Sequence, residues 1–459
     1  MSILEKMRQE LISKKIFEQA KSYAYEYMDG IDSMDVFPQK GALKLLKHFD
    51  EELNQESTSA EVLLDQLHKY GSPNTTAQIG GRYFGFVNGG AVPASLATKW
   101  LADIWDQNGG LFYTSAINAK LEQVCEKWLK DLFNLPKSTV AGFVSGTSTA
   151  NLCAIAAARY HLLKRQDWDV NEKGLVGSPP IRIIAHEQVH SSVKKTFALL
   201  GLGKANIEWV PSDDQGRMQV DKMPMLDDSC LLILQAGNAN TGSFDRFDTI
   251  CDLANKAEAW VHIDGAFGLW VAASKSLSYL TKGIEKATSW AVDGHKTLNT
   301  PYDSGIVLCK ENDALISAMQ ATGEYIVYSD QREPILYTNE MSKRARAIEL
   351  WATLKYLGKN GIDEMVSQFH KHAKYLESEL KKGGFTIMND VVFNQVLVAC
   401  DSDEQTLSCL SNLQQSGKLW LGESKWLGHS VIRVSICSWY TSVSDINKTV
   451  DEFVKARNA

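Results

Sequence analysis

The spacing of hydrophobic residues changes twice along the chain and divides it into three stretches. Residues 1 to about 70 carry apolar residues at helical spacing, and charges interrupt the first twenty, MSILEKMRQELISKKIFEQA, every few positions. This pattern is typical of an amphipathic helix and unlike the apolar centre of a signal peptide. We therefore expect residues 1–80 to form a helical N-terminal segment.

The middle stretch alternates short apolar runs with longer helical patterns. The runs IRIIAHE, LLILQAG and WVHIDGAFG alternate with helical segments such as TANLCAIAAARYHLLKR and TICDLANKAEA. Strands that are apolar throughout and separated by helices indicate a mostly parallel sheet with helices on both faces. We expect an α/β domain over residues 81–345, with ligands beyond the carboxyl ends of its strands.

The last stretch has a different pattern. Two helical segments, ARAIELWATLKYLGKNG and MVSQFHKHAKYLESELKKGG, precede three runs that read as strands, FTIMND, NQVLVAC and VIRVSICSW. We expect residues 346–459 to form a small α+β C-terminal domain.

Composition narrows the class of partner. Lys and Arg number 48 and Asp and Glu 55, which gives a net charge of −7, and no long basic run occurs, so nucleic acid and anionic membrane are disfavoured as partners. No apolar run approaches the roughly 18 residues of a membrane span. The eight cysteines are scattered without C-x-x-C spacing, which favours a reducing compartment and disfavours a zinc site. We expect a cytoplasmic protein that acts on a small molecule and needs no metal.

Polar residues follow two of the expected strands and precede helices. Ser145, Gly146 and Thr147 could expose backbone N–H groups to an anion at a helix start, or could form an ordinary N-cap cluster. His190 follows the strand IRIIAHE and reads either as a capping or packing residue or as a catalytic one.

Two charged residues follow later strands. Asp264 ends the apolar strand within WVHIDGAFG, where a buried carboxylate requires a cation or hydrogen-bond donor unless it merely caps a turn. Gly265 and Ala266 beside it leave room for a flat ligand. Lys296 lies in WAVDGHKTLNTPYDSG, residues 290–305, and is either a solvated charge near a turn or a buried amine used for covalent chemistry.

One cofactor requires all of these features together. Pyridoxal 5'-phosphate (PLP) needs a phosphate site, a lysine for a Schiff base, and a carboxylate that keeps its ring nitrogen protonated. The order and spacing of the four sites at successive strand ends therefore indicate a PLP site.

At these residues the chain resembles the group II PLP-dependent amino-acid decarboxylases, of the aspartate-aminotransferase fold type I. The resemblance runs from about residue 80 to the end, and its most specific part is the HK pair with the upstream D-x-A. The matching segments are RYFGF, SGTSTANLCAIAAAR, HSSV, AGNANTGSFD, VHIDGAFG, HKTLNTPYDSG, SKRARAIELWATLKYLG and IRVSICSW.

The resemblance implies a role for each site residue. Lys296 would form the Schiff base, Asp264 would pair with the ring nitrogen, Ala266 would pack on the ring, and His190 would stack on its other face and assist the reaction. Ser145, Gly146, Thr147 and His295 would hold the phosphate, and Asn238 falls where the family usually has a threonine near the cofactor. The resemblance also implies a homodimer with the active site at the interface.

Five positions depart from the family pattern. In this chain Gly294 replaces the usual proline, Thr297 the usual tryptophan and Gly265 an alanine. Thr149 is found where a glutamate is common, and Lys343 replaces the first of two arginines. None of these changes removes a chemical group that the cofactor requires, so they indicate a divergent branch.

The expected reaction is decarboxylation of an L-amino acid to its amine and CO2. Transamination or oxidative deamination with the same cofactor, and a non-catalytic scaffold, are the alternatives. RYFGF and LFY (111–113) either favour an aromatic substrate or belong to the core. Tyr325, Tyr328 and Tyr337 are candidates for a proton donor from the loop at 322–341, or packing residues. Arg344, Arg346 and Arg433 are either substrate ligands or structural ion pairs.

Overall fold

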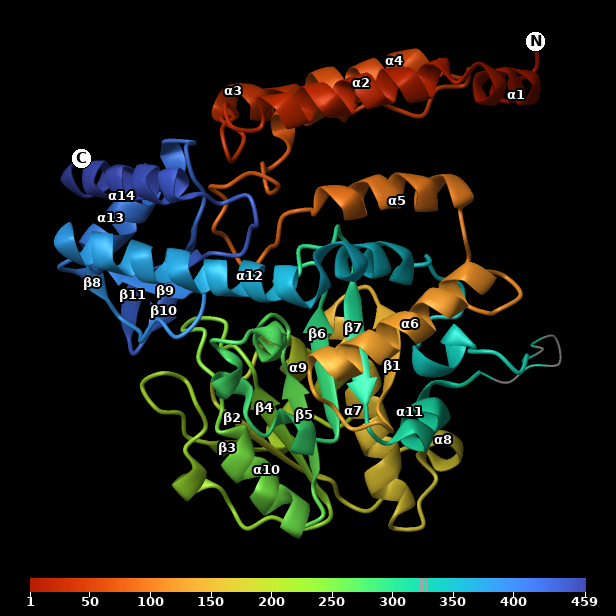
Figure 1. Ribbon diagram of the computed structural model, residues 1–459, viewed down its shortest axis with the longest axis vertical. Coiled ribbons are helices and arrows are strands. Elements are labelled where there is room, and N and C mark those ends of the chain that lie inside the picture. The colour runs from red at the N-terminus through yellow and green to blue at the C-terminus, as the bar shows by residue number, and fades with distance from the viewer. Residues whose placement is uncertain (322, 324–325, 327) are drawn as a thin grey trace.

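The computed structural model describes residues 1–459 except 322, 324–325 and 327. Among the described residues, a seven-stranded sheet in the order β1-β7-β6-β5-β4-β2-β3 forms the centre of the molecule (Figure 1). Strands β2 to β6 pair in parallel, whereas β7 is antiparallel to both β1 and β6. The expected mostly parallel α/β sheet is therefore confirmed. The strands are β1 (Val140–Val144), β2 (Arg182–His186), β3 (Ile207–Val210), β4 (Cys230–Gln235), β5 (Trp260–Asp264), β6 (Ser289–Asp293) and β7 (Gly305–Cys309).

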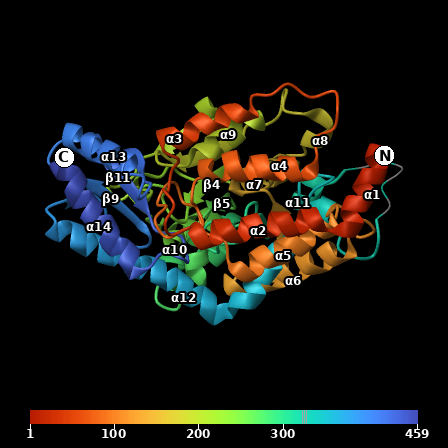
Figure 2. The ribbon, with the colours of Figure 1, turned by 90° about the horizontal axis from the view of Figure 1, so that it is seen from above.

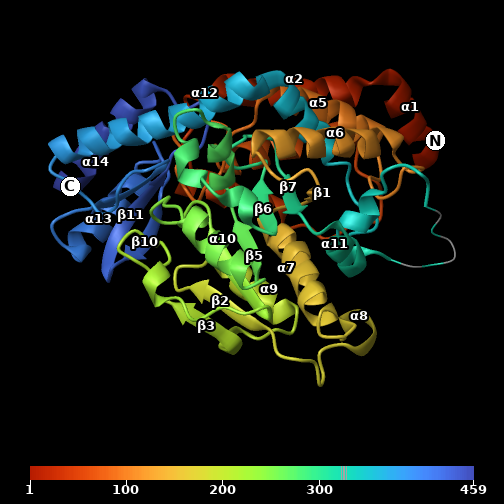
Figure 3. The ribbon, with the colours of Figure 1, turned by 60° about the horizontal axis from the view of Figure 1, so that its bottom comes forward.

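Helices cover both faces of this sheet, as the apolar strands require (Figure 3). Every residue of the central strands β4 to β7 is buried. One face packs against α7 (Thr147–Lys164), α9 (Ser191–Leu199) and α11 (Asn312–Met319). The other packs against α6 (Ala116–Leu132), α10 (Phe247–Lys256) and α12 (Ala347–Lys382). The short helix α8 (Val170–Lys173) follows α7.

The parallel register brings the carboxyl ends of the strands to one edge. Gln235 of β4 pairs with Asp264 of β5, and Asp264 pairs in turn with Ala291 of β6. The expected site residues that follow these strands therefore meet at this edge.

The C-terminal part contains a second sheet, antiparallel and in the order β10-β11-β9-β8. Its strand β10 has the sequence GESKW and alternates exposed and partly covered residues, so no apolar run marks it. The two helices expected after residue 345 form one element, α12, with a kink at Gly358, whose φ of +58° suits glycine. The elements here are β8 (Thr386–Ile387), β9 (Gln395–Ala399), β10 (Gly422–Trp426), β11 (His429–Ser435), α13 (Asp403–Gln415) and α14 (Val443–Asn458).

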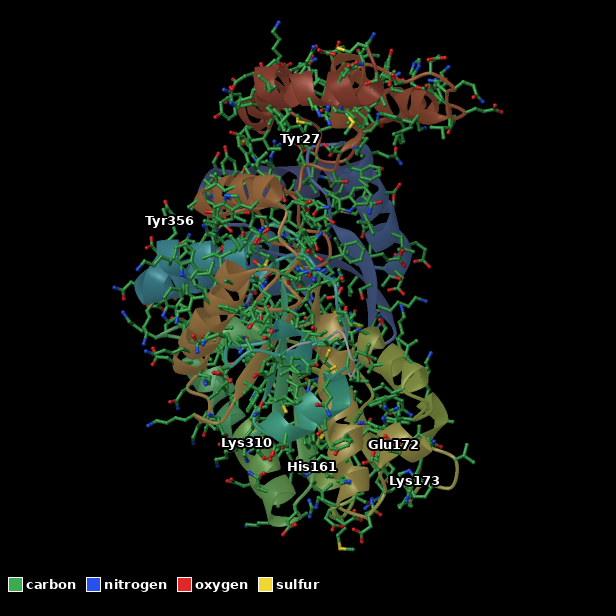
Figure 4. All side chains as sticks on the ribbon, turned by 90° about the vertical axis from the view of Figure 1, so that its right-hand side faces the viewer. Tyr27, His161, Glu172, Lys173, Lys310 and Tyr356 are labelled. Atoms are coloured by element: carbon green, nitrogen blue, oxygen red, sulfur yellow. The ribbon has the colours of Figure 1, made fainter. Side chains whose placement is uncertain are left out.

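The N-terminal helices form a layer apart from the rest of the chain (Figures 1 and 4), and Figure 2 shows this layer from above. The helices are α1 (Ile3–Ser13), α2 (Lys15–Gly30), α3 (Lys40–Leu43) and α4 (Ala60–Gln66), with α5 (Pro93–Trp105) below them. Neither α1 nor α2 contains a buried residue. Large apolar side chains of α1 and α5 are exposed, namely Ile3, Leu4, Met7, Leu11, Ile12, Trp100, Leu101, Ile104 and Trp105. In the described part of the chain, no helix combines the length and the apolar character that a membrane crossing needs.

Candidate active site

A cavity of about 470 Å³ opens at the carboxyl edge of the large sheet. Its volume lies in the range of ordinary small-molecule sites. The lining residues come from the segment before α5, from the ends of the sheet strands, and from β11 of the second sheet. They are Phe86, Val87, Asn88, Ser145, Gly146, Thr147, Ser148, Thr149, His190, Ser192, Gln235, Gly237, Ala239, Asp264, Ala266, Phe267, Asp293, His295, Lys296 and Arg433.

All the expected site residues except Asn238 line this cavity. The neighbours of Asn238, Gly237 and Ala239, belong to the wall, but Asn238 itself does not. Its Oδ1 accepts hydrogen bonds from the backbone N–H groups of Asn240 (2.8 Å) and Thr241 (3.2 Å), so its side chain stabilises the loop. The structure gives no support for a contact between Asn238 and a ligand in this cavity.

The amino end of α7 forms one polar wall. The Ser145 and Thr149 hydroxyls are 3.1 Å apart, and the Thr147 hydroxyl is buried with no hydrogen-bond partner among the described residues. A Cβ on Gly146 would lie 3.3 Å from the His295 ring. Backbone N–H groups at a helix start attract anions, and an unsatisfied hydroxyl adds a donor. This end of the cavity therefore suits a phosphate group.

Lys296 lies in the turn after β6 and pairs with a carboxylate that the sequence analysis did not single out. Its Nζ is 3.0 Å from Oδ2 of Asp293, the last residue of β6. Oδ1 of the same Asp293 accepts a hydrogen bond of 2.6 Å from the N–H of Thr147, the first residue of α7. The spacing of three residues in VDGHK could have suggested the pair. Lys296 is therefore an ion-paired amine in the cavity wall, and not a solvated surface charge.

The unusual neighbours of Lys296 have local structural reasons. Gly294 donates its N–H to the carbonyl of Ser304 (2.8 Å), which a proline could not do, and a Cβ there would meet the Ser304 hydroxyl at 2.5 Å. The Thr297 hydroxyl is buried and donates to the carbonyl of Phe267 (2.7 Å). A Cβ on Gly265 would lie 2.8 Å from the Cβ of Leu269. These departures therefore fit the folded turn around the lysine.

His295 is held on two sides. Its Nδ1 accepts a hydrogen bond from the N–H of Ser304 (3.1 Å), and its ring stacks on Tyr302 with 4.2 Å between centroids. Burial lowers the pKa of His295, while the nearby Asp293 acts in the opposite direction. A neutral imidazole with a fixed orientation results.

Asp264 is oriented by a chain of buried hydrogen bonds. Its Oδ2 accepts from the side-chain amide of Asn151 (3.1 Å), and Asn151 Oδ1 lies 2.9 Å from Nε2 of His262. Nδ1 of His262 is 2.9 Å from the Ser289 hydroxyl, which also accepts from the Trp260 indole N–H (2.9 Å). These supporting residues were missed, because nothing in their local sequence shows that they meet. The chain of bonds fixes the carboxylate toward the cavity.

The pH dependence of stability offers a test of the His262 environment. Complete burial lowers the pKa of His262 to about 4, so its stabilising contribution is present above the unfolded value near 6.5 and is lost as the pH falls toward 4. Between pH 7.5 and 5.0 the wild type should lose about 2 kcal/mol more unfolding free energy than His262→Gln. Urea unfolding at the two pH values measures this difference. Equal losses in both proteins would contradict the assignment.

His190 lies at the rim of the cavity and caps α9. Its Nδ1 lies 2.8 Å from the Ser192 hydroxyl and accepts a hydrogen bond from the Ser192 N–H (3.3 Å). Desolvation by the surrounding protein lowers the pKa of His190, and Asp264 partly offsets this effect. The capping interpretation of this residue is therefore confirmed, and its place in the cavity wall leaves the catalytic interpretation a prediction.

Of the three candidate arginines, only Arg433 lines the cavity. Arg344 and Arg346 form ion pairs with Asp303 and with a glutamate each, so they have structural partners. Arg433 donates to the carbonyl of Ala239 (2.9 Å), and its buried Nε has no hydrogen-bond partner among the described residues. Burial lowers the pKa of this guanidinium. Arg433 is therefore a cation available to a ligand.

The aromatic segments contribute little to the cavity. Phe86 of RYFGF lines it, whereas Tyr83 and Phe84 are buried in the core. Neither Phe112 nor Tyr113 belongs to the described cavity wall. The core interpretation therefore holds for Tyr83 and Phe84, whereas Tyr113 is exposed and belongs neither to the core nor to the described cavity wall.

Of the three candidate loop tyrosines, the structure describes Tyr328 and Tyr337. Tyr325 lies outside the described residues. Tyr328 donates to the carbonyl of Ala321 (2.6 Å), and the Tyr337 ring lies 4.3 Å from the Arg332 guanidinium. Neither residue lines the described cavity. Tyr337 thus packs against Arg332, whereas Tyr328 is an exposed residue that bonds within its own segment.

Lys343 belongs to a buried charge cluster beside the sheet. Its Nζ donates to the carbonyl of Phe143 (3.3 Å) and lies 3.7 Å from Glu122. Arg332 pairs with Glu122 (3.1 Å) and with Glu126 (2.7 Å) on α6. Lys130 also pairs with Glu126 (3.2 Å), so Lys343 lies in a network of ion pairs at the position where the resemblance has an arginine.

Comparison with known proteins identifies the family of this chain. The family model of the pyridoxal-dependent decarboxylase conserved domain matches residues 43–399. The chain belongs to the pyridoxal-dependent decarboxylase family. This membership confirms the resemblance inferred from the motifs, and it establishes PLP as the cofactor.

Curated relatives of this decarboxylase family member have different substrates in their names. The acidic amino acid decarboxylase GADL1 of mouse is 29% identical over 274 residues, which cover 55% of this chain and 48% of the relative. The aromatic-L-amino-acid decarboxylase of Bacillus atrophaeus is 29% identical over 276 residues, which cover 57% of this chain and 55% of the relative. The chain thus spans about half the length of these relatives.

A solved structure has the same fold over nearly the whole chain. The crystal structure of mouse CSAD in apo form has a TM-score of 0.88 and 20% sequence identity, and the match covers 97% of this chain and 99% of the other. This likeness confirms the fold of the decarboxylase family for this chain.

The residues present fit PLP. The cavity combines an amine on Lys296, a buried carboxylate on Asp264, and an α7 amino end with the unsatisfied Thr147 hydroxyl. These are an attachment point, a partner for the ring nitrogen and a phosphate cradle. Each of the three groups that PLP requires is therefore present in the wall.

Proposed function

We propose that this chain decarboxylates an L-amino acid to its amine and CO2, using PLP held on Lys296. The observation that carries this proposal is the convergence of Lys296, Asp264 and the amino end of α7 on one cavity. Membership of the pyridoxal-dependent decarboxylase family supports the same reaction.

Each cavity residue has a proposed task. Lys296 attaches the cofactor, and the Asp264 carboxylate, oriented by Asn151, keeps a proton on the ring nitrogen. His190 and Ala266 confine the ring, while Ser145 to Thr147 and His295 hold the phosphate. When bound, the cofactor supplies an electron sink for the bond that releases CO2. The Asp264 carboxylate would strengthen this sink by holding a proton on the ring nitrogen, so its negative charge is central.

Two substrate classes are compatible with the cavity. Phe86 in the wall supports an aromatic side chain, as the sequence suggested. Arg433 supports an acidic side chain, because its buried Nε lacks a partner in the described structure. A guanidinium bound to the reacting carboxylate would stabilise the substrate more than the departing CO2, and would therefore slow the reaction. We therefore expect Arg433 to bind an acidic group on the substrate side chain instead. Names of relatives include both acidic and aromatic decarboxylases.

A screen tests the proposal directly. Cofactor-loaded protein is incubated with each common L-amino acid, and CO2 release is measured. Release with one acidic or aromatic substrate supports the proposal and identifies the class. A protein that binds PLP but releases no CO2 from any of them would contradict it.

Arg433→Met should separate the two substrate classes. If the substrate is acidic, loss of the charged hydrogen bonds should raise its KM by about 10- to 100-fold, with cofactor attachment unchanged. If the substrate is aromatic, KM should change little. Steady-state kinetics measures the change, with Arg433→Lys as the control that retains the charge.

Transamination or oxidative deamination remains the alternative, because the same cofactor site can serve it. A non-catalytic scaffold is the second alternative. The altered residues beside Lys296 were the reason to consider a non-catalytic protein. Gly294 and Thr297 both form hydrogen bonds that order the turn around Lys296, so their presence does not favour that alternative.

We also propose a homodimer with the active site at the interface. The exposed apolar side chains of α1 and α5, described above, need a cover in solution. Tyr27 of α2 lies on the side of the N-terminal layer that faces the rest of the molecule in Figure 4, and its hydroxyl bonds to Thr75. Even so, α2 contains no buried residue. The cytoplasmic location stays a prediction, consistent with eight cysteines that are all free thiols in the described structure.

A further inference from the structure

Asp293 occupies a place in the cavity where an anion from a ligand is expected. Its side chain is almost fully buried, and its Oδ1 accepts the 2.6 Å hydrogen bond from Thr147 at the amino end of α7. The dipole of an eighteen-residue helix favours negative charge there. The chain's own carboxylate thus already uses part of this anion site.

The same carboxylate is fixed from other sides. Its Oδ2 lies 3.0 Å from Lys296 Nζ and 3.6 Å from His295 Nε2. The backbone of Asp293 donates its N–H to Ala266 (2.9 Å), and its carbonyl accepts from the Trp270 indole N–H (2.8 Å). The carboxylate therefore cannot leave the cavity wall without breaking several contacts.

An independent observation points to a ligand at the same place. Thr147 lines the cavity and is more than nine-tenths buried, and its hydroxyl has no hydrogen-bond partner in the described structure. A buried hydroxyl without a partner is uncommon, and a phosphate oxygen would satisfy it. The phosphate and Asp293 would then share one helix end.

We propose that Asp293 competes with the phosphate group of the cofactor for the amino end of α7, and so sets how tightly this chain holds PLP. This inference rests on the proposed attachment of PLP in this cavity. Two anions at one helix end repel each other, so the negative charge of Asp293 weakens retention of the phosphorylated cofactor. Asp293 is a positioning residue that tunes cofactor affinity.

The test compares PLP with pyridoxal, which has the same ring and aldehyde but no phosphate. Absorbance titrations of the cofactor-free protein give the two dissociation constants. Asp293→Asn keeps an acceptor for Thr147 and removes the charge, so it should tighten PLP binding by about tenfold, and pyridoxal binding far less. Asp293→Ser, which also removes the charge, should act in the same direction. Asp221→Asn, the same change at an exposed position, is the matched control and should have no effect.

Three results would overturn the inference. The first is a PLP dissociation constant that is unchanged or higher in both Asp293 variants. Equal tightening of PLP and pyridoxal is another, because the carboxylate would then act through Lys296 alone. Binding of PLP with no change in its absorbance, in the wild type and in the variants, would instead contradict the proposed attachment on Lys296.

Discussion

Replacing Lys296 with alanine is expected to abolish covalent attachment of PLP and to lower decarboxylation by at least about 10³-fold. Of the proposed site residues, Lys296 alone would form a covalent bond with the cofactor. Its amine lies 3.0 Å from the buried carboxylate of Asp293. Without the amine, the cofactor is held by non-covalent contacts alone. The absorbance band of the covalently attached cofactor, at about 420 nm, should form in the wild type and be absent in Lys296→Ala.

A matched control separates this effect from a general loss of charge. Lys282→Ala removes an exposed lysine at the surface and should leave both the band and the activity unchanged. Retention of the band in Lys296→Ala would contradict the assignment of the attachment point.

The second large effect is expected at Asp264. Asp264→Asn keeps the shape of the side chain and its contact with Asn151 but removes the charge that holds a proton on the ring nitrogen. We expect kcat to fall by about 10²- to 10³-fold, while the band of the attached cofactor persists. Steady-state kinetics together with absorbance measures both parts of this expectation.

Asp221→Asn serves as the control for the chemical change, since that carboxylate is exposed and does not belong to the described cavity wall. A kcat of Asp264→Asn close to that of the wild type would show that the ring nitrogen does not depend on this charge. Loss of the band would instead point to a role in cofactor binding.

The residues that follow strands could be predicted because the parallel register brings strand ends to one edge. Asp264 and Lys296 lie 32 positions apart in the sequence, yet β5 and β6 are neighbours, so both reach the same cavity. The same reasoning placed Ser145 to Thr147 at the amino end of α7. A buried sheet with helices on both faces leaves little freedom in where these ends lie.

The partners of these residues could not be predicted, because they depend on side-chain direction. Asn151 faces inward on α7 and meets His262 across more than a hundred residues of sequence. Asn238 follows β4, but its side chain bonds within its own loop, which the sequence does not reveal. Arg433 reaches the cavity only because β11 of the second sheet packs beside the first.

Elements without an apolar pattern were also missed. Strand β10 has polar and exposed positions along GESKW, so its pairing with β11 is decided by backbone hydrogen bonds at a sheet edge. The N-terminal helices have the expected amphipathic pattern, but their apolar sides remain exposed in the single chain. That pattern alone does not say which surface covers them.

The most direct test of the proposed reaction is the stoichiometry of its products. The cofactor-loaded protein is incubated with the amino acid that gives the strongest signal in the screen, and CO2, amine, and keto acid or aldehyde are quantified together. We predict one CO2 and one amine for each amino acid consumed, and none of these products from Lys296→Ala. Formation of keto acid or aldehyde without a matching amount of amine would contradict decarboxylation as the function of this chain.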